Sequence, residues 1–497
     1  MHALSSLDTF FLAAEDGRTN TNVSALAIVD GLRADGSRLT REHLVDLVGE
    51  RLHLLPPLRW RLAEVPFDLG HPYWVDTDVD VEFHVRELGL PAPGTTAQLE
   101  QQVARLAGLP MDRTRPLWEI WLLHGLADGR VGVLTKLHHA AVDGVSGAEI
   151  MGVLFDGSPE GRDLAPAPPF RGERVPGQVA LLGRGLSDAA RHSLRALGAG
   201  WRTLTHLDHV PTVRGLPGTR TTGRTARRLA EVAGIREDGD LLDAPRLESP
   251  RTHLNGTISR HRRLATVSLP LDDVRLLKDR HGTTVNDVVV ALCAGALRSW
   301  LGSTARLPAE PLVAAVPVSV RTRAEQGTFG NRVGTMVVPL PTDEADPIDR
   351  LRACRAELAV AKERHRAIPA TLLRDSTELV PPVLFGRVTR ALTRLAATEG
   401  LSPAANVVIS NVPGSRLPLY CAGSRVLEHY PVSTISDSLG LNITVFSYLD
   451  QLNVGLVADR DLVDDLDGLA EALRAELATL LAADATTAPA PAAEVAR

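Results

Sequence analysis

Two stretches of the chain alternate short apolar runs with amphipathic segments. From residue 1 to about 155, strand-like runs such as VSALAIVDG, PYWVDTDVD and VGVLTKLHHA accompany helical segments such as TREHLVDLVGERL. The pattern over 262–301 predicts a strand, a helix, a loop and a second helix. Further strands are predicted in LVAAVPVSV, GTMVVPLP, ANVVISNVPG and LNITVFSYLDQLNVGLVAD, with a helix over 347–365. This alternation favours an α/β fold built from two units.

The passages outside these stretches differ in composition. Residues 155–177 are dense in Pro and Gly, 210–250 are rich in Gly and Arg, and the chain ends in an alanine-rich tail. A chain of 497 residues is also too long for one hydrophobic core. We therefore predict an N-terminal domain over 1–155, a connecting segment over 156–255, a C-terminal domain over 256–480 and a disordered tail over 481–497.

The connecting segment contains an amphipathic pattern over 178–204. Its apolar side carries Val179, Leu182, Leu186, Leu197, Trp201 and Leu204, and Arg184, Arg191, Arg195 and Arg202 cluster opposite. A basic amphipathic helix can lie in an anionic membrane interface. The alternative is that the apolar side packs on the two domains while the arginines face water.

Composition narrows the class of protein. A formal net charge of −6 gives no overall cationic field for nucleic acid. No uninterrupted apolar run approaches the ~18 residues of a membrane span, and the N-terminus lacks the basic start and apolar core of a secretory signal. We therefore expect a cytoplasmic protein. Cys293, Cys354 and Cys421 show no paired short spacing, so we expect them to be packing residues and expect no metal site.

The candidate chemistry lies in KLHHAAVDGVSG, at the end of a predicted strand. Because successive strand residues point to opposite faces, we expect one of His138 and His139 to face packing and the other a cleft. Such a pair is poorly placed for one metal ion, whereas a neutral imidazole can take a proton from a hydroxyl. Asp143 could orient the ring or fix the loop through an ion pair, and Gly144 leaves space. Taken alone, either ring could equally be a core histidine.

HHAAVDG resembles the His-His-x-x-x-Asp-Gly motif of the CoA-dependent acyltransferase superfamily, which includes chloramphenicol acetyltransferase. Five further stretches occur in order: SSLDTFFLAAED, MDRTRPLWEIWLLHGL, RTHLNGTISRHRR, TTVNDVVVALCAG and ISNVPGS. Together they resemble the bacterial wax ester synthase/diacylglycerol acyltransferase family, from residue 4 to about 480.

The resemblance implies two chloramphenicol-acetyltransferase-like domains, each a mixed sheet with flanking helices, with an active-site tunnel between them. It implies an O-acyltransferase that moves a long-chain acyl group from acyl-CoA to diacylglycerol, in triacylglycerol and glycerol metabolism, or to a fatty alcohol, forming wax esters. Acyl-CoA would be a substrate, and no cofactor is expected. His139 would be the base, His138 a supporting residue and Asp143 structural. The lipid substrates imply peripheral association with the inner membrane face or with lipid droplets.

Two other motifs have a structural and a functional interpretation. Pro116, Leu117 and Trp118 suit a strand that enters a core, whereas the resemblance places them in the wall of the acyl tunnel. Thr284 can cap a helix, with Asp287 returning the cap. The resemblance instead counts Asn286 and Asp287 among residues needed for activity, with Asn286 a candidate hydrogen-bond donor to the oxyanion.

Asn411, Pro413 and Gly414 read as a turn, and the resemblance suggests that they line the site, with Ser415 in place of the family's proline. Arg262 and Arg263 could meet the phosphates of CoA or form a solvated basic turn.

The reaction expected is direct transfer, because the sequence has no Gly-x-Ser-x-Gly nucleophile elbow. Two alternatives stay open. One keeps the chemistry and changes the acceptor to an amine or a polyketide diol, and the other is a catalytically silent lipid-binding protein.

Overall fold

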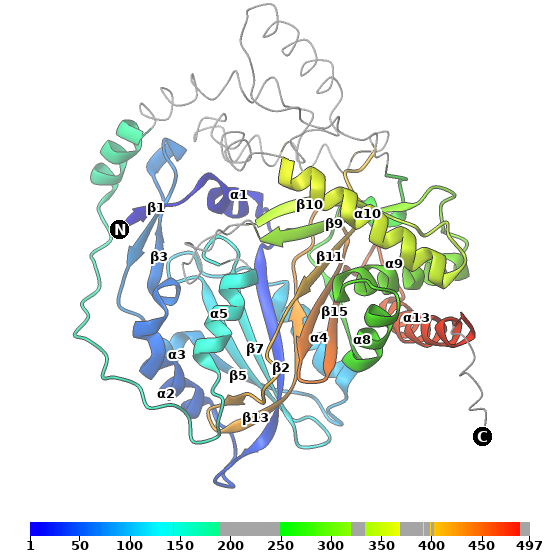
Figure 1. Cartoon of the computed structure of the whole chain (residues 1–497). Helices are drawn as coiled ribbons and strands as arrows, with labels where there is room; N and C mark the ends of the chain where they lie inside the picture. The colour runs from blue at the N-terminus through cyan, green and yellow to red at the C-terminus, as the bar shows by residue number, and fades with distance from the viewer. Residues whose placement is uncertain are drawn as a thin grey trace, which may run out of the picture.

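The computed structural model describes residues 1–142, 144–188, 249–319, 333–367, 391, 398 and 402–487. Over these residues the strands form two six-stranded mixed sheets and a small three-stranded sheet (Figure 1). Helices cover both large sheets, which confirms the predicted α/β class with mixed sheets and flanking helices.

The first sheet has the order β12-β13-β2-β7-β6-β5, and only the β5–β6 pair is parallel. Its strands are β2 (Asn22–Arg33), β5 (Val85–Gly89), β6 (Trp118–His124), β7 (Val131–His138), β12 (Tyr420–Cys421) and β13 (Ser424–Val432). The small sheet joins β1 (His2–Ala3), β4 (Tyr73–Asp76) and β3 (Trp60–Ala63). The helices of this half are α1 (Ser6–Ala14), α2 (Arg41–Arg51), α3 (Val81–His84), α4 (Thr96–Ala107) and α5 (Gly144–Leu154).

The two faces of the first sheet are covered differently. On one face, α5 packs through Ile150 and Leu154 against the core that includes Leu122 (Figure 1). On the other face, Leu99 of α4 packs against Leu134 of β7. Because α4 also packs along β8 of the second sheet, it lies between the two sheets.

The second sheet has the order β10-β9-β11-β14-β15-β8, in which β11 runs parallel to both of its neighbours. Its strands are β8 (Arg262–Pro270), β9 (Leu312–Ser319), β10 (Val333–Leu340), β11 (Val407–Val412), β14 (Leu441–Tyr448) and β15 (Gln451–Asp459). The helices α8 (Leu271–Arg280), α9 (Val285–Ser303), α10 (Pro347–Ala367) and α13 (Leu466–Thr487) gather beside it (Figure 1). The strands and helices predicted from 262 onward are therefore confirmed.

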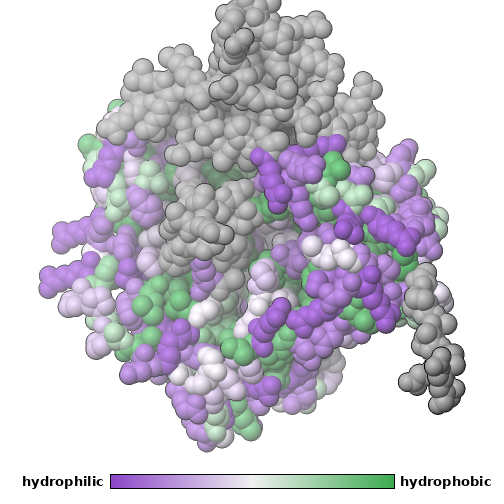
Figure 2. All heavy atoms as spheres, viewed as in Figure 1, coloured by the Kyte–Doolittle hydropathy of each residue, from purple (hydrophilic) through white to green (hydrophobic). Residues whose placement is uncertain are grey.

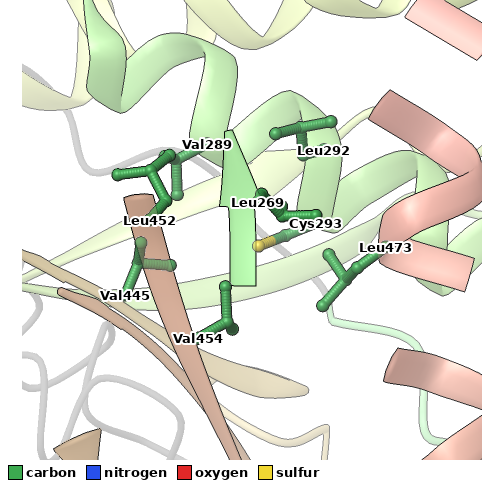
Figure 3. Close-up of a pocket in the computed structure, with 8 residues that line it drawn as sticks. All are labelled: Leu269, Val289, Leu292, Cys293, Val445, Leu452, Val454 and Leu473. Atoms are coloured by element: carbon green, nitrogen blue, oxygen red, sulfur yellow. The ribbon is translucent and has the colours of Figure 1, made fainter. Parts of the chain in front are cut away.

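The helix α9 is the centre of this second core. Among the described residues it is the one helix long and apolar enough to cross a membrane, but 72% of that window is buried inside the protein. A small cavity of about 10 Å³ lies beside it, lined by apolar residues of β8, α9, β14, β15 and α13 (Figure 3). That space holds at most about one water molecule, so the core is closely packed. Cys293 lines the cavity, and burial raises the pKa of its thiol to about 12. All three cysteines are buried and unbridged, as expected of packing residues.

Two features differ from the division of the chain predicted by sequence. Residues 256–480 do not all belong to the second sheet, because β12 and β13 complete the first sheet, where β13 pairs with β2. The predicted disordered tail also begins too early. The helix α13 continues to Thr487, since Ala483 packs on the second core and Asp484 accepts a hydrogen bond from His281 at 3.1 Å. The connecting segment is described only over 156–188 and 249–255, so most of the predicted 178–204 helix lies outside the described residues.

Candidate functional site

The two histidines lie where β7 ends. The backbone N–H of His138 donates to the carbonyl of Leu117 on the neighbouring strand at 3.0 Å, and that of His139 donates to the carbonyl of Thr21 at 2.8 Å. The turn then closes with a hydrogen bond from Ala141 N–H to the carbonyl of His138 at 2.9 Å. Both rings therefore project from a main chain that is fixed on either side.

His138 is fully engaged by the protein. Its side chain is 1% exposed, and its Nδ1 accepts the backbone N–H of Ala140 at 3.0 Å. Because Nδ1 must keep its lone pair for this bond, the ring proton sits on Nε2. Nε2 faces the Glu15 carboxylate at 3.2 Å and the Thr21 hydroxyl at 3.3 Å. The acceptor nitrogen of this imidazole is thus already used, which suits a supporting residue and not a base.

Glu15 is the partner that sequence reasoning did not single out. It follows directly after α1 and lies more than a hundred residues from His138 in the chain. Burial alone would raise the pKa of its carboxyl, but hydrogen bonds from His138, Arg113 and Thr21 lower that pKa to about 2. Arg113 approaches the carboxylate at 2.9 Å. The signal available was an acidic residue within the motif SSLDTFFLAAED, but nothing local shows which side chain it meets.

His139 has different surroundings, as the strand pattern predicts. Its side chain is only half-buried. Its ring lies parallel to that of Phe11 in α1, with 3.9 Å between the ring centroids and 12° between the ring planes. The imidazole that is not sealed into the core is therefore the candidate for proton transfer.

The helix that follows the turn is firmly held. Asp143 lies outside the described residues, and Gly144 begins α5. At the far end of α5, the buried guanidinium of Arg51 donates to the carbonyls of Val153 at 2.8 Å and Leu154 at 2.9 Å. It also pairs with Asp156 at 2.6 Å. A helix anchored at its C-terminus in this way fixes where its N-terminus, and the turn before it, can lie.

The structure brings Pro116, Leu117 and Trp118 next to the histidine turn, because β6 pairs with β7 and Trp118 lies opposite Leu137. Leu117 and Trp118 are nevertheless core residues, with 2% and 1% exposed. The Trp118 indole N–H donates to the carbonyl of Leu58 at 2.7 Å, and its ring stacks on His84. Leu117 and Trp118 thus lie in the core beside β7.

Asp287 and Asn286 behave differently at the start of α9. Thr284 and Asp287 form a reciprocal capping box, in which each accepts the other's backbone N–H. Asp287 also lies 3.6 Å from the Lys362 ammonium of α10. Asn286 is half-buried, and within the described part of the chain its amide has no hydrogen bond. Capping therefore explains Asp287 and leaves the Asn286 amide available.

Asn411 is half-buried near the end of β11, and Pro413 is exposed just beyond it. Gly414 has a structural reason to be glycine. A Cβ at this position would lie 2.0 Å from the carbonyl oxygen of Ser447, and the Gly414 N–H donates to the Ser447 hydroxyl at 3.0 Å. The turn after β11 is thus pressed against β14.

The expectation of a phosphate contact meets a difficulty at Arg262. Its guanidinium donates to the carbonyls of Ser259 and Arg18, and it lies 3.6 Å from Asp459 with only 5% of its side chain exposed. It therefore joins the two halves of the molecule and is not free for a ligand. Arg263 is half-buried, and its Nε is buried without a hydrogen-bond partner.

Comparison with known proteins gives a consistent picture. The family model of the wax ester synthase/diacylglycerol acyltransferase catalytic domain matches residues 4–289, and that of the family's C-terminal domain matches 329–481. The chain is 37% identical to a Mycobacterium tuberculosis protein provisionally named as a diacylglycerol O-acyltransferase, over 97% of this chain and 90% of that one.

Two solved structures resemble the fold. The wax ester synthase/diacylglycerol acyltransferase of Marinobacter aquaeolei VT8 is 29% identical and superposes with a TM-score of 0.68 over 98% of this chain and 100% of that one. The first condensation domain of the CDA synthetase is 17% identical, with a TM-score of 0.54 over 97% and 96% of the two chains. The second likeness shows a shared fold alone.

Proposed function

The chain belongs to the wax ester synthase/diacylglycerol acyltransferase family, and on that premise we propose that it is an acyl-CoA-dependent O-acyltransferase with His139 as its general base. The proposed acceptor is diacylglycerol, a long-chain alcohol, or both. Substrates would meet at His139 in a tunnel between the two sheets. The enzyme would work in the cytoplasm, at the inner membrane face or on lipid droplets.

The reaction proceeds by direct transfer. The His139 imidazole takes the proton of the acceptor hydroxyl while the oxygen forms a bond to the thioester carbonyl carbon. The tetrahedral oxyanion then collapses, the C–S bond breaks, and the leaving CoA thiolate recovers the proton from the imidazolium. General base catalysis of this kind contributes about 10²- to 10⁴-fold to a rate.

The contrast between the two imidazoles carries this proposal. The Nδ1 of His138 accepts a hydrogen bond from the backbone N–H of Ala140, and its protonated Nε2 faces the Glu15 carboxylate. It thus supports the turn and is unsuited to take a proton. His139 is half-buried and its ring lies flat on that of Phe11, so the ring edge that carries the two nitrogens points away from this phenyl face.

Asn286 is the proposed oxyanion donor, since its amide is uncommitted at the start of α9. A positioned donor of this kind is worth about 10²- to 10³-fold in kcat. We assign Asp287 to holding the helix start and Asp143 to holding the turn.

An acyl-transfer assay tests the function. Purified protein is given hexadecanoyl-CoA with hexadecanol, a diacylglycerol or an aliphatic amine, and ester or amide products are counted. We expect ester from one or both alcohols and a loss of about 10²- to 10⁴-fold for His139→Ala. Amide as the main product would point to a different acceptor class. Ester formation by His139→Ala at the parent rate would rule out the base.

We also propose that the protein contacts a lipid surface through helical residues 178–188. Within this helix Leu181 and Gly185 are buried, whereas Val179 is 85% exposed and Leu186 is 54% exposed. Over the described residues, Val179 and Leu186 of the side predicted to be apolar therefore face outward, whereas Leu182 of the same side is half-buried. Such an apolar stripe suits the interface of a bilayer or droplet.

A neighbouring turn supports the same surface. Phe67 is 79% exposed and has a φ of 59°, a left-handed conformation that is unfavourable for a phenylalanine. Its loop is pressed against the helix, since a Cβ on Gly70 would lie 3.0 Å from the Cα of Gly185. On the face seen in Figure 2, apolar residues are scattered among polar ones over the described part of the chain.

Centrifugal fractionation with liposomes tests this contact. The triple variant Val179→Ser/Leu186→Ser/Phe67→Ser should stay in the supernatant and not sediment with the liposomes. The control variant Leu32→Ser, at a side chain 52% exposed on β2, should sediment with the liposomes as the parent does. Equal recovery of the triple variant and the parent in the liposome pellet would rule out a lipid contact through this surface.

A further inference from the structure

Phe11 is the aromatic side chain against which the proposed base rests. The two rings are nearly parallel, with centroids 3.9 Å apart. Phe11 lies in α1, which starts with a capping box: Ser5 accepts the N–H of Asp8 at 3.1 Å, and the Asp8 carboxylate accepts the Ser5 N–H at 3.2 Å. The helix that presents Phe11 is therefore fixed at its beginning.

Thr21 fixes the same helix relative to the histidine turn. Its hydroxyl donates to the carbonyl of Phe11 at 3.0 Å, and its own carbonyl accepts the N–H of His139 at 2.8 Å. One residue thus binds the main chains of both stacked residues. Glu15, one turn after Phe11, also accepts the Thr21 N–H at 3.1 Å. The register between the two rings is consequently set by the backbone and does not depend on the stacking alone.

This geometry has a chemical consequence for a base. A ring lying flat on a phenyl face cannot tilt, while the edge that carries its nitrogens stays clear of that face. When the imidazole takes a proton it becomes a cation, and the face of an aromatic ring attracts a cation. The contact is therefore stronger in the transition state than in the resting enzyme, which is the condition for raising kcat.

We propose that Phe11 is a positioning residue for His139, holding the plane of the imidazole and stabilising the imidazolium that forms during acyl transfer. This inference rests on the proposed role of His139 as the base.

Phe10 provides a matched control. It is the adjacent residue of α1, it is half-buried like Phe11, and its ring meets Phe11 edge to face at 5.8 Å. No ring contact with His139 is found for Phe10 in the described structure. Replacing either phenylalanine by leucine removes a similar apolar area from the same helix, but only one replacement removes the face on which the base rests.

The experiment compares Phe11→Leu, Phe11→Tyr and Phe10→Leu in steady-state acyl transfer. We expect Phe11→Leu to lower kcat about ten-fold, a typical worth of an aromatic pair with some cation–π character, with KM for acyl-CoA and acceptor changed less than about two-fold. Phe11→Tyr, which keeps the face, should stay within about two-fold of the parent, as should Phe10→Leu. Urea unfolding identifies a variant that fails to fold, in which case Phe11→Met replaces Phe11→Leu.

Two results would overturn the inference. One is a kcat of Phe11→Leu equal to the parent, and the other is a loss in Phe11→Tyr as large as in Phe11→Leu. The single variant His139→Ala, measured beside Phe11→Leu, separates this inference from the proposed role of His139. If His139→Ala alone is fully active, the base assignment fails. If His139→Ala is inactive and Phe11→Leu is not impaired, only the role of Phe11 fails.

Discussion

The two large sheets bury charged side chains in different places. Around the end of β7, the first sheet buries Lys136 completely, beside Glu119 at 3.6 Å and with its ammonium donating to the carbonyl of Leu109 at 2.6 Å. The helix-covered face of the second sheet is mainly an apolar cluster that includes Leu297. Its buried ion pair, Arg350 with Glu476, joins the covering helices α10 and α13. Buried polar groups stabilise little but fix geometry when their bonds are made. The buried charges of the first sheet therefore lie close to the proposed catalytic histidine, whereas those of the second lie among its covering helices.

The largest expected effect tests whether the second core is only support. Leu297→Ala replaces a fully buried side chain of α9, so the free energy of unfolding measured by urea titration should fall by about 2–5 kcal/mol. The kcat of the folded fraction should equal that of the parent. Leu276→Ala, at a side chain that is 40% exposed on α8, should change stability by less than about 0.5 kcal/mol. A changed kcat in Leu297→Ala would show that the second core also tunes the chemistry.

The next effect concerns the place where the two sheets meet. His429 of β13 lies beside Phe446 of β14, both of its ring nitrogens are buried without a hydrogen-bond partner, and burial lowers its pKa to about 4. The folded protein keeps this ring neutral, whereas the unfolded chain binds a proton below an ordinary pKa of about 6.5. The contribution of His429 to the free energy of unfolding should therefore be fully present above about pH 6.5, and it should fall by up to about 3 kcal/mol as the pH drops toward 4.

Urea midpoints at pH 7.5 and pH 5 measure this loss. His429→Leu should reduce the pH dependence, and His124→Gln, at a histidine whose side chain is 44% exposed, should leave it unchanged. An unaltered acid loss in His429→Leu would assign the effect to other groups.

The smallest effect separates capping from chemistry at the start of α9. Thr284→Ala removes the hydroxyl that accepts the Asp287 N–H and should cost about 1 kcal/mol of stability, with kcat nearly unchanged. Asn286→Ala should do the reverse, lowering kcat while the urea midpoint stays. If both variants lose stability equally and neither loses activity, Asn286 has no catalytic role.

Local patterns predicted much of this molecule. The β-branched residues and bounded length of VGVLTKLHH indicated β7, and Thr284 as a cap, with Asp287 returning it, indicated where α9 begins. Strand alternation also indicated that His138 and His139 have different environments. The roles of Glu15 and Phe11 were not predicted, because their contacts with the histidines join residues more than a hundred positions apart. The pairing of β13 with β2 was not predicted for the same reason, since the residue pattern of a strand does not show which strand it pairs with.

That placement has a consequence for how the protein can be divided. The edge of β2 is covered by residues encoded about four hundred positions later, with Val432 opposite Ser24. A fragment ending near residue 255 would expose this edge as a bare row of N–H and C=O groups, the template on which chains self-associate. The N-terminal half thus needs the C-terminal half to stay soluble. Expressed alone, it should aggregate, whereas co-expression of both halves should prevent this.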